Sequence, residues 1–446
     1  MYSQEKSPYS LLLLLFLLIL FLPGCYTLFS TSDDEDREPR RDRSRTAPST
    51  LLGDFQPEPQ VAPPDDIRSV QFYHKEDRQS APILNLDDED SYLSLRFDHL
   101  GTRTRMFRIR INHYNADWKQ SNLSRSFYLS GFRQTEITGG RASSVQNPAY
   151  QHYHYTFPDG FSFNYSGNYM LEVYSYENDR LLFSLPFFVT ENVGNINTRV
   201  EQLYAGAGPH RLSHQLFTTY DYPDFVRNPQ SNLTINFTQN QFWGRSRKAS
   251  MPDFTEANRI RTYIPRNMSF PGRYEFRELD LRTLKQDGRR IVEYRPEMIP
   301  PRVSLFRDVV DLDVQPYNRT SHRFGQILSD RDAKYVDVHF ELQVPDENRS
   351  EDPIYVIGPF NNWQIHEANR MTFDSENQRY RGSALMKQGI YDYKYVVKTD
   401  DGIDELRLDA AFFDGLQEYH TNVYYRDPQQ GADRLLKMDR QTIRGR

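Results

Sequence analysis

Apolar and polar residues alternate at every second position in several segments of the chain, which is the pattern of a β-strand with one buried face. In residues 92–97 the apolar face carries Leu93, Leu95 and Phe97. Turn sequences such as Pro158-Asp159-Gly160 separate such segments. The predicted strands of this region are residues 92–97, 106–113, 150–157, 169–174 and 182–189. Short strands with regular turns predict an immunoglobulin-like β-sandwich over residues 67–193.

The pattern continues to the end of the chain. Residues 196–332 contain alternating segments but also a charged, proline-interrupted stretch, and we expect a middle β domain with a long loop there. Residues 333–430 form the clearest module, with alternation over residues 335–342 and a further strand over 389–397. No segment after residue 25 predicts a helix longer than a turn or two. The sequence therefore predicts an all-β protein of tandem immunoglobulin-like β-sandwich domains.

An apolar run from Leu11 to Leu22 opens the chain and ends at Gly24-Cys25. The run is shorter than the about 20 residues that a membrane span requires, and it fits the apolar region of a secretory signal. Cys25 is the only cysteine, and it follows a small residue at the expected cleavage point. We interpret residues 1–24 as a lipoprotein signal peptide and Cys25 as the lipidated mature N-terminus. The alternative is an ordinary signal or signal anchor with a chance cysteine.

Residues 25–66 combine an acidic run, several arginines and several prolines with few apolar side chains. Such a composition cannot bury enough surface to fold, so the sequence predicts a disordered linker between the anchor and the first domain. An export address for the outer leaflet is the sharper alternative, although the acidic run at residues 33–36 lies several positions beyond Cys25.

Composition narrows the function. The net charge of −6 gives no basic field for nucleic acid. Because Cys25 is the only cysteine, thiol catalysis, disulfides and cysteine-based metal sites are excluded. A mean hydropathy of −0.77 excludes a multispan membrane protein. Tyrosine and phenylalanine are abundant, with 30 and 29 copies, and both favour strands.

Motifs of catalysis are missing from the sequence. There is no Gly-x-Ser-x-Gly elbow, no His-Glu-x-x-His pair and no phosphate-binding glycine loop. A glycosidase needs two positioned carboxylates, and no pair stands out among 61 acidic residues. His152 and His154 share one face of a predicted strand, where two imidazoles can bind a metal, but no third ligand follows from spacing. We therefore expect no enzyme, no cofactor and no metal site, and interpret this pair as a half-exposed strand.

One constellation in the C-terminal module suggests sugar binding. The turn at Asn361-Asn362-Trp363, taken with Lys394, resembles the glycan-binding early-set modules appended to branching and debranching enzymes. That resemblance implies an indole that stacks on sugar rings while a lysine and an asparagine, here Asn422, bond to hydroxyls. The second tryptophan of those modules is missing, so we expect weak glycan binding. The alternative is that Trp363 caps the sandwich core.

A second resemblance spans most of the chain. The motifs that carry it in the first predicted domain are Leu93-x-Leu95-x-Phe97-Asp98-x-Leu100, Asn115-Ala116-Asp117-Trp118, Tyr128-Leu129-x-Gly131-Phe132 and Ser166-Gly167-Asn168-Tyr169-Met170-Leu171-x-Val173-Tyr174. Those that follow are Phe270-Pro271-Gly272-x-x-Glu275-Phe276-Arg277-x-x-Asp280, Tyr355-Val356-x-Gly358-x-Phe360-Asn361-x-Trp363, Lys387-Gln388-Gly389-x-Tyr391-x-Tyr393 and Asp433-Arg434-Leu435. In this order they resemble the plug proteins of the type IX secretion system.

Trp118 is a further candidate binding residue. The alternative is that Trp118 only forms a corner of the first sandwich.

The resemblance implies a non-catalytic secreted β protein that closes the periplasmic opening of an outer-membrane translocon barrel while the barrel is empty. The expected partners are that barrel and, through the anchor, the periplasmic face of the outer membrane. Two segments depart from the family pattern, Tyr274 and residues 409–413. The anchor and linker indicate a tethered variant. A lipid-anchored glycan-binding protein of the envelope is the competing hypothesis.

Overall fold

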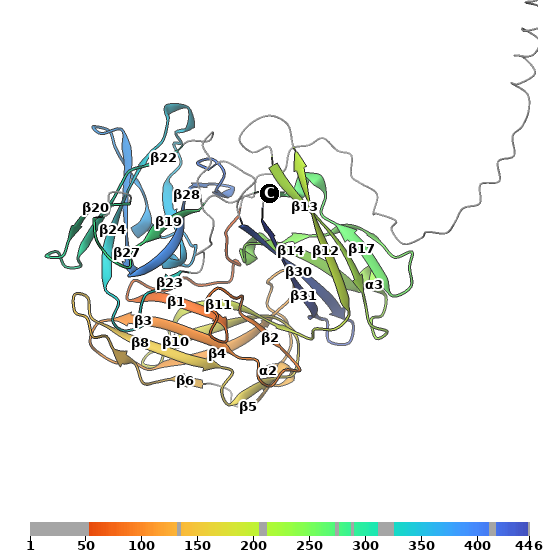
Figure 1. Cartoon of the computed structure of the whole chain (residues 1–446). Helices are drawn as coiled ribbons and strands as arrows, with labels where there is room; N and C mark the ends of the chain where they lie inside the picture. The colour runs from red at the N-terminus through yellow and green to blue at the C-terminus, as the bar shows by residue number, and fades with distance from the viewer. Residues whose placement is uncertain are drawn as a thin grey trace, which may run out of the picture. The chain divides into compact units, whose positions relative to one another are not determined.

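The computed structural model describes residues 53–131, 135–204, 212–272, 276–286, 290–310, 325–409 and 416–444 (Figure 1). The predicted signal peptide, Cys25, the first part of the predicted linker, Tyr274 and residues 410–413 lie outside the described residues. The chain is 53% strand and 6% helix, which confirms the all-β prediction. Within the described residues no helix is long and apolar enough to cross a membrane. The described helical segments are α2 (Arg125–Tyr128), α3 (Pro229–Asn232), η2 (Trp243–Arg245), η3 (Arg266–Met268), η4 (Asp346–Asn348), η5 (Pro359–Asn361) and η6 (Glu367–Asn369).

The first sandwich packs two sheets over one aromatic core. Its first sheet has the order β1 (Ile67–His74), β3 (Leu93–Leu100), β8 (Tyr150–Phe157) and β7 (Arg141–Ala142). Its second sheet has the order β2 (Ile83–Asn85), β11 (Leu181–Thr190), β10 (Gly167–Ser175), β4 (Phe107–Tyr114) and β6 (Thr135–Ile137), and β5 (Leu129–Gly131) pairs with β9 (Phe161–Phe163) beside them. The predicted inward residues Leu93, Leu95 and Phe97 are all buried in this core. The period-two pattern therefore identified the correct face of β3.

The middle sandwich is completed by the C-terminal end of the chain (Figure 1). One sheet has the order β12 (Asn195–Tyr204), β13 (Leu212–Asp221), β17 (Arg259–Tyr263) and β16 (Ser250–Asp253), with β18 (Phe270–Pro271) also paired to β13. The other has the order β15 (Arg247–Lys248), β14 (Leu233–Gln239), β30 (Leu416–Asp427) and β31 (Ala432–Arg444). Tyr419 and Val423 of β30 join the core of this sandwich. The predicted domain boundary at residue 430 therefore does not follow the sheets, because β30 pairs with β14 and β31 pairs with β30.

The third sandwich takes strands from before its predicted start at residue 333. One sheet has the order β20 (Ile291–Arg295), β21 (Arg302–Leu305), β24 (Tyr335–Gln343), β27 (Arg379–Lys387) and β26 (Thr372–Asp374), and β22 (Asp308–Val309) also pairs with β24. The other joins β19 (Arg277–Asp280), β28 (Gly389–Thr399), β23 (Gln326–Ile327), β25 (Ile354–Ile357) and β29 (Gly402–Asp404). Leu279, Val303 and Leu305 enter its core. Residues 291–309 of the proline-interrupted stretch, which include β20, β21 and β22, therefore belong to the third sandwich and not to a loop of the middle domain.

Residues 53–66, which we name the strap, are ordered and packed. Phe55 is 0% exposed, and its ring meets the ring of Phe242 edge-on at 4.5 Å between centroids. Gln56 donates to the carbonyl of Asn362 at 3.2 Å, and the Val61 amide donates to Ser184 Oγ at 2.8 Å. The strap thus contacts all three sandwiches. The prediction of a disordered linker is therefore wrong for residues 53–66. The buried side chain of Phe55 supplies apolar burial that the composition of the linker as a whole does not suggest.

Candidate functional site

Trp363 does not present a face for stacking. The indole is 4% exposed, and three aromatic rings surround it: Phe242 and Phe276 at 5.4 Å and Phe55 at 6.3 Å between centroids. These rings come from the strap, the middle sandwich and the segment before β19. Trp363 therefore belongs to an aromatic cluster that joins the strap, the middle sandwich and the third sandwich. This arrangement resembles the alternative interpretation, in which Trp363 caps a core.

Lys394 is fully buried in an ionic cluster rather than exposed for sugar hydroxyls. Its Nζ lies 2.8 Å from Asp409 Oδ2 and 3.7 Å from Glu405 Oε2. Arg277 Nη1 donates to Asp409 Oδ1 at 3.0 Å, and Arg245 pairs with Glu405. Burying charges is costly unless they are paired, and here paired charges of both signs replace water.

Asn422 and Trp118 lie away from Lys394 in the fold. Asn422 is buried in β30 of the middle sandwich, where its Nδ2 donates to Tyr424 Oη at 3.3 Å. Trp118 sits in a turn with a φ of 60°, and its ring packs on Phe188 at 5.7 Å. The structure therefore does not assemble the predicted sugar platform, and it places Trp118 at a packed corner.

Three of the motifs behind the family resemblance meet where the first sandwich contacts the C-terminal hairpin of the middle one. The Ala116 amide donates to Asp433 Oδ2 at 2.9 Å, and the Asp433 amide donates to Asn115 Oδ1 at 3.0 Å. Tyr424 Oη donates to Asn168 Oδ1 at 2.8 Å. These residues are more than 250 positions apart in sequence. Residues of these motifs therefore form the contact between the first and middle sandwiches.

An ion pair reinforces the same contact. Arg434 donates to both oxygens of Glu191, at 2.7 and 2.6 Å, in the bidentate arrangement that makes such pairs strong. Ser166 Oγ donates to Glu191 at 2.6 Å and accepts from the Leu435 amide at 3.0 Å. Gly167 has a φ of 147°, and a Cβ there would lie 2.2 Å from His113 Nε2, so only glycine fits.

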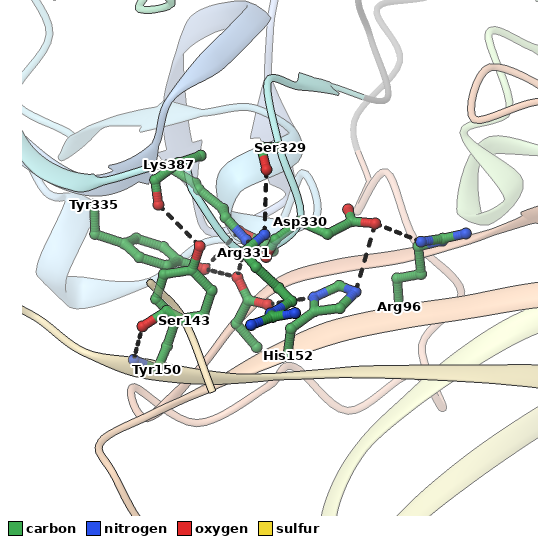
Figure 2. Close-up of polar contacts among 12 residues, drawn as sticks. Arg96, Ser143, Tyr150, His152, Ser329, Asp330, Arg331, Tyr335 and Lys387 are labelled. Atoms are coloured by element: carbon green, nitrogen blue, oxygen red, sulfur yellow. Dashed lines mark hydrogen bonds and ion pairs between the residues drawn. The ribbon is translucent and has the colours of Figure 1, made fainter. Parts of the chain in front are cut away.

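A second contact, between the first and third sandwiches, is a buried polar network centred on Asp98; Figure 2 labels its members His152, Tyr335 and Lys387. Asp98 is 1% exposed, and three side chains contact its two carboxylate oxygens. His152 Nδ1 lies 2.7 Å from Oδ1, while Tyr335 Oη and Lys387 Nζ donate to Oδ2 at 2.7 and 2.6 Å. Two of these partners come from β24 and β27 of the third sandwich. We name Asp98, His152, Tyr335 and Lys387 the Asp98 network.

Asp330 extends the Asp98 network toward the surface. Its carboxylate accepts from Arg78 at 2.7 Å and from Arg96, and its backbone carbonyl accepts from Lys387 Nζ at 2.7 Å (Figure 2). Burial raises the pKa of Asp330, but the hydrogen bond and charge of Arg78, with the charges of His152 and Arg96, outweigh it and lower the pKa below its usual value. The carboxylate therefore stays charged and holds the two arginines of the first sandwich to the third.

Burial also shifts the pKa values of Lys387 and Tyr335 in the Asp98 network. Loss of hydration lowers the pKa of Lys387 even though the charge and hydrogen bond of Asp98 oppose that shift. Burial, followed by the charge of Asp98, raises the pKa of Tyr335 well above its usual value, so Tyr335 remains a hydrogen-bond donor. Perturbed groups of this kind mark functional sites or structural ion networks. Here the carboxylate of Asp98 is paired with Lys387 and hydrogen-bonded to Tyr335, while His152 Nε2 has no hydrogen-bond partner among the described residues. The arrangement joins the first sandwich to the third.

The predicted histidine pair separates into two environments. His152 is buried against Asp98, whereas His154 on the same face is exposed. Among the described residues no group of three or more histidine, cysteine or acidic side chains could hold a metal ion. Asp98, Tyr335 and Lys387 were missed as site residues because each is a polar residue on the outward face of a strand, which sequence alone assigns to solvent.

These observations define the class of protein. It is an all-β protein of three sandwiches, in which the middle sandwich includes strands from the C-terminal end of the chain and buried polar contacts join the sandwiches. Residues 67–191 match the family model of the Type 9 secretion system plug protein 1st domain. The match covers the first sandwich and confirms the resemblance that its motifs suggested. It associates the chain with a type IX secretion plug-related role, and that association implies the cell envelope.

Solved structures extend the comparison to the whole fold. A hypothetical protein from Parabacteroides merdae ATCC 43184 is similar over 89% of this chain and 100% of its own, with 25% identity and a TM-score of 0.77. The C-terminal domains of Streptococcus pyogenes AspA (5% identity, 84% and 98% coverage, TM-score 0.16) and Streptococcus agalactiae BspA (8%, 83% and 97%, 0.18) are too distant to carry an argument. No curated protein matches the chain.

Proposed function

We propose that this protein is a non-catalytic component of the type IX secretion system that closes the periplasmic opening of the outer-membrane translocon barrel when the barrel is empty. The observation that carries the proposal is the family match over the first sandwich. A pore seal needs a surface that keeps its shape while it contacts a rim. The strap, the exchanged strands and the Asp98 network join the sandwiches in a way that supports such rigidity.

The surface offers side chains suited to a protein interface. A standard specific interface buries roughly 1,600 Å² in total, and aromatic residues and arginine dominate its energy. Tyr204, at the end of β12, is 72% exposed, and Phe127 and Phe225 are also exposed. Arg434 lies 4.9 Å from the Phe225 ring. We infer that exposed aromatic residues of the first and middle sandwiches contact the translocon.

A pull-down and a leakage assay test the proposal together. The full-length chain, tagged at Arg446, should co-purify with a large outer-membrane barrel from detergent-solubilised membranes. A strain that lacks the gene should become sensitive to large antibiotics, because an unsealed pore passes them. Complementation with the wild-type gene is the control. Absence of a barrel in the pull-down, together with an intact permeability barrier in the deletion strain, would refute the plug function.

We further propose that Cys25 is acylated and tethers the protein to the periplasmic face of the outer membrane. The lone cysteine at the end of a signal-like run supports this. A fatty-acid probe should label the wild-type protein and not the Cys25→Ala variant. Equal labelling of both proteins would overturn the anchor without bearing on the plug.

The competing glycan-binding function loses the feature on which it rested. Trp363, Lys394 and Asn422 are all buried, and Asn422 belongs to a different sandwich from Lys394. No exposed indole face remains at these positions for a sugar ring to stack on, so the plug function is the better supported of the two.

A further inference from the structure

The middle sandwich has a long strand at the edge of one sheet. β12 (Asn195–Tyr204) is ten residues long, and among the described residues it pairs only with β13, in one register without a bulge (Figure 1). No other described segment makes a backbone hydrogen bond to it. The other long edge strand, β31, is partly covered, because the carbonyls of Leu435 and Leu436 accept hydrogen bonds from the amides of Glu191 and Val193. The outer edge of β12 can therefore pair with a further strand.

The inward face of β12 is apolar or neutral along its whole length. Thr198 Oγ1 lies 3.0 Å from Thr421 Oγ1 of the facing sheet, and Ile196 and Val200 pack against the core. Side chains alternate along a strand, so the even-numbered residues form the inward row. Tyr204 belongs to this row but is 72% exposed. The end of β12 therefore leaves an aromatic side chain uncovered by its own sandwich.

The outward face carries the only charged residues of the strand. Arg199 and Glu201 are two positions apart, and Arg199 Nη1 lies 3.2 Å from Glu201 Oε1. Proteins commonly protect an edge strand with lysine, proline, a bulge or a charge on the inward face. β12 has none of these. Its sequence therefore does not oppose the addition of a strand, and its two charges decide which strand fits.

The two charges are complementary to a second copy of β12. In an antiparallel pair with Val200 opposite Val200 of the second copy, Arg199 lies opposite Glu201 of the second copy, and the reverse pair forms as well. Opposite charges in such positions stabilise a sheet, whereas like charges destabilise it. A slide of two residues in either direction instead places two arginines or two glutamates opposite each other. The favoured register also places the exposed ring of Tyr204 opposite the β-branched Ile196, a pairing that stabilises sheets.

We propose that two copies of this protein associate through β12, in an antiparallel pair centred on Val200. The contact is two-fold symmetric and joins the two β12–β13–β17–β16 sheets into one. Ten residues from each copy are fewer than the about 20–30 of a standard interface, so the dissociation constant should lie in the micromolar range. The proposal goes beyond the plug function and does not depend on it, because neither the family match nor the anchor enters the argument. A paired copy covers Tyr204 and so withholds that side chain from the translocon.

Charge reversal tests the register. Light scattering of the full-length protein in detergent, over a dilution series, should show dimers that dissociate at micromolar concentration. Arg199→Glu and Glu201→Arg each place like charges opposite each other twice, and each should weaken dimerisation about tenfold. An equimolar mixture of the two variants restores both opposite-charge pairs and should dimerise like the wild type. The ion pair within the strand is lost in both variants, so its loss does not explain recovery in the mixture.

Cysteine cross-linking is an independent test of the same pair. Val200→Cys places two thiols opposite each other, at a Cα separation of about 4.5–5.5 Å that suits a disulfide. Asn197→Cys is the matched control, because in this register the two thiols lie six residues apart, or about 20 Å. Under mild oxidation only Val200→Cys should form a disulfide-linked dimer above the background of the wild type, whose one cysteine is Cys25.

Three results would each overturn the proposal. They are a wild-type protein that stays monomeric throughout the dilution series, a mixture of the charge variants that associates no better than its components, and equal cross-linking of the two cysteine variants.

Discussion

Lys387 donates a hydrogen bond of 2.6 Å to Asp98, and the two residues are 289 positions apart. Asp98 lies on the outward face of β3, while Lys387 ends β27. The ammonium group also lies 4.2 Å from the centre of the Tyr150 ring. Asp98, on the outer face of the first sandwich, is therefore buried against the third sandwich. The stability of this contact depends on both Asp98 and Lys387.

Replacement of Lys387 by methionine should destabilise the protein by about 3–5 kcal/mol, because it leaves the Asp98 carboxylate buried without its cation. Urea denaturation at neutral pH measures the change. Lys334→Met is the matched control, since Lys334 is exposed on the approach to β24, and we expect its effect to stay within about 0.5 kcal/mol. Adding Asp98→Asn to Lys387→Met should cost less than the sum of the single variants. A simple sum would show that the two residues do not interact.

His113 should make stability depend on pH between about 4 and 6.5. Burial lowers its pKa to about 4, although contacts to the Ser166 carbonyl and the charge of Asp433 oppose that shift. Between the folded value and the ordinary value of 6.5, the unfolded chain binds a proton that the folded chain does not. Stability therefore falls as pH decreases through this window, by about 1.4 kcal/mol per unit and about 3 kcal/mol in all.

Denaturation of wild type and His113→Gln at several pH values checks this dependence. The variant should lose a large part of the slope between pH 4 and 6.5, whatever its stability at pH 7. Ser121 Oγ lies 2.9 Å from Nδ1 and the Ser166 carbonyl 3.1 Å from Nε2, which fixes the neutral ring with Nε2 as donor. An identical slope in both proteins would mean that His113 does not titrate in this window.

The strap should contribute to stability through Phe55. Phe55→Ala removes a fully buried ring and should cost about 3–5 kcal/mol in the free energy of unfolding. A chain that begins at residue 67 should be destabilised at least as much, whereas one that begins at residue 53 retains every strap contact and serves as the control. Thermal unfolding of the three proteins gives the comparison. Equal stability of the two truncations would restore the disordered-linker interpretation for residues 53–66.

A fragment of residues 333–430 should not fold alone. It lacks β19, which pairs with β28, and β21, which pairs with β24, and it carries β30 without its partner β14. Unpaired edges and exposed apolar faces make such a fragment prone to aggregation. The fragment of residues 276–409 keeps all strands of the third sandwich and should show better-dispersed amide resonances. A well-dispersed spectrum from residues 333–430 would contradict the strand assignment.

Local patterning determined much of this protein. The alternation around Leu93, Leu95 and Phe97 identified the buried face of β3, because a strand repeats every two residues whatever its partner. Alternation and turns together gave the all-β class, and the ordered motifs gave the resemblance to plug proteins that the family match confirmed over residues 67–191. The proposed signal peptide and the proposed acylation of Cys25 also rest on a short contiguous segment.

Only the tertiary structure decided which outward-facing residues are buried and which strands complete each sandwich. Asp98 and His154 both lie on outward faces, yet one is enclosed and the other exposed. β30 was not among the strands predicted from the sequence, and its pairing with β14 depends on complementary faces almost two hundred residues apart. The resemblance to glycan-binding modules implied that Trp363 stacks on sugar, with a core cap as the alternative, and aromatic rings from distant segments cover it. The two-residue period of a strand shows on which face of its sheet a side chain lies. Whether that face meets solvent or another sandwich depends on packing between segments that are distant in sequence.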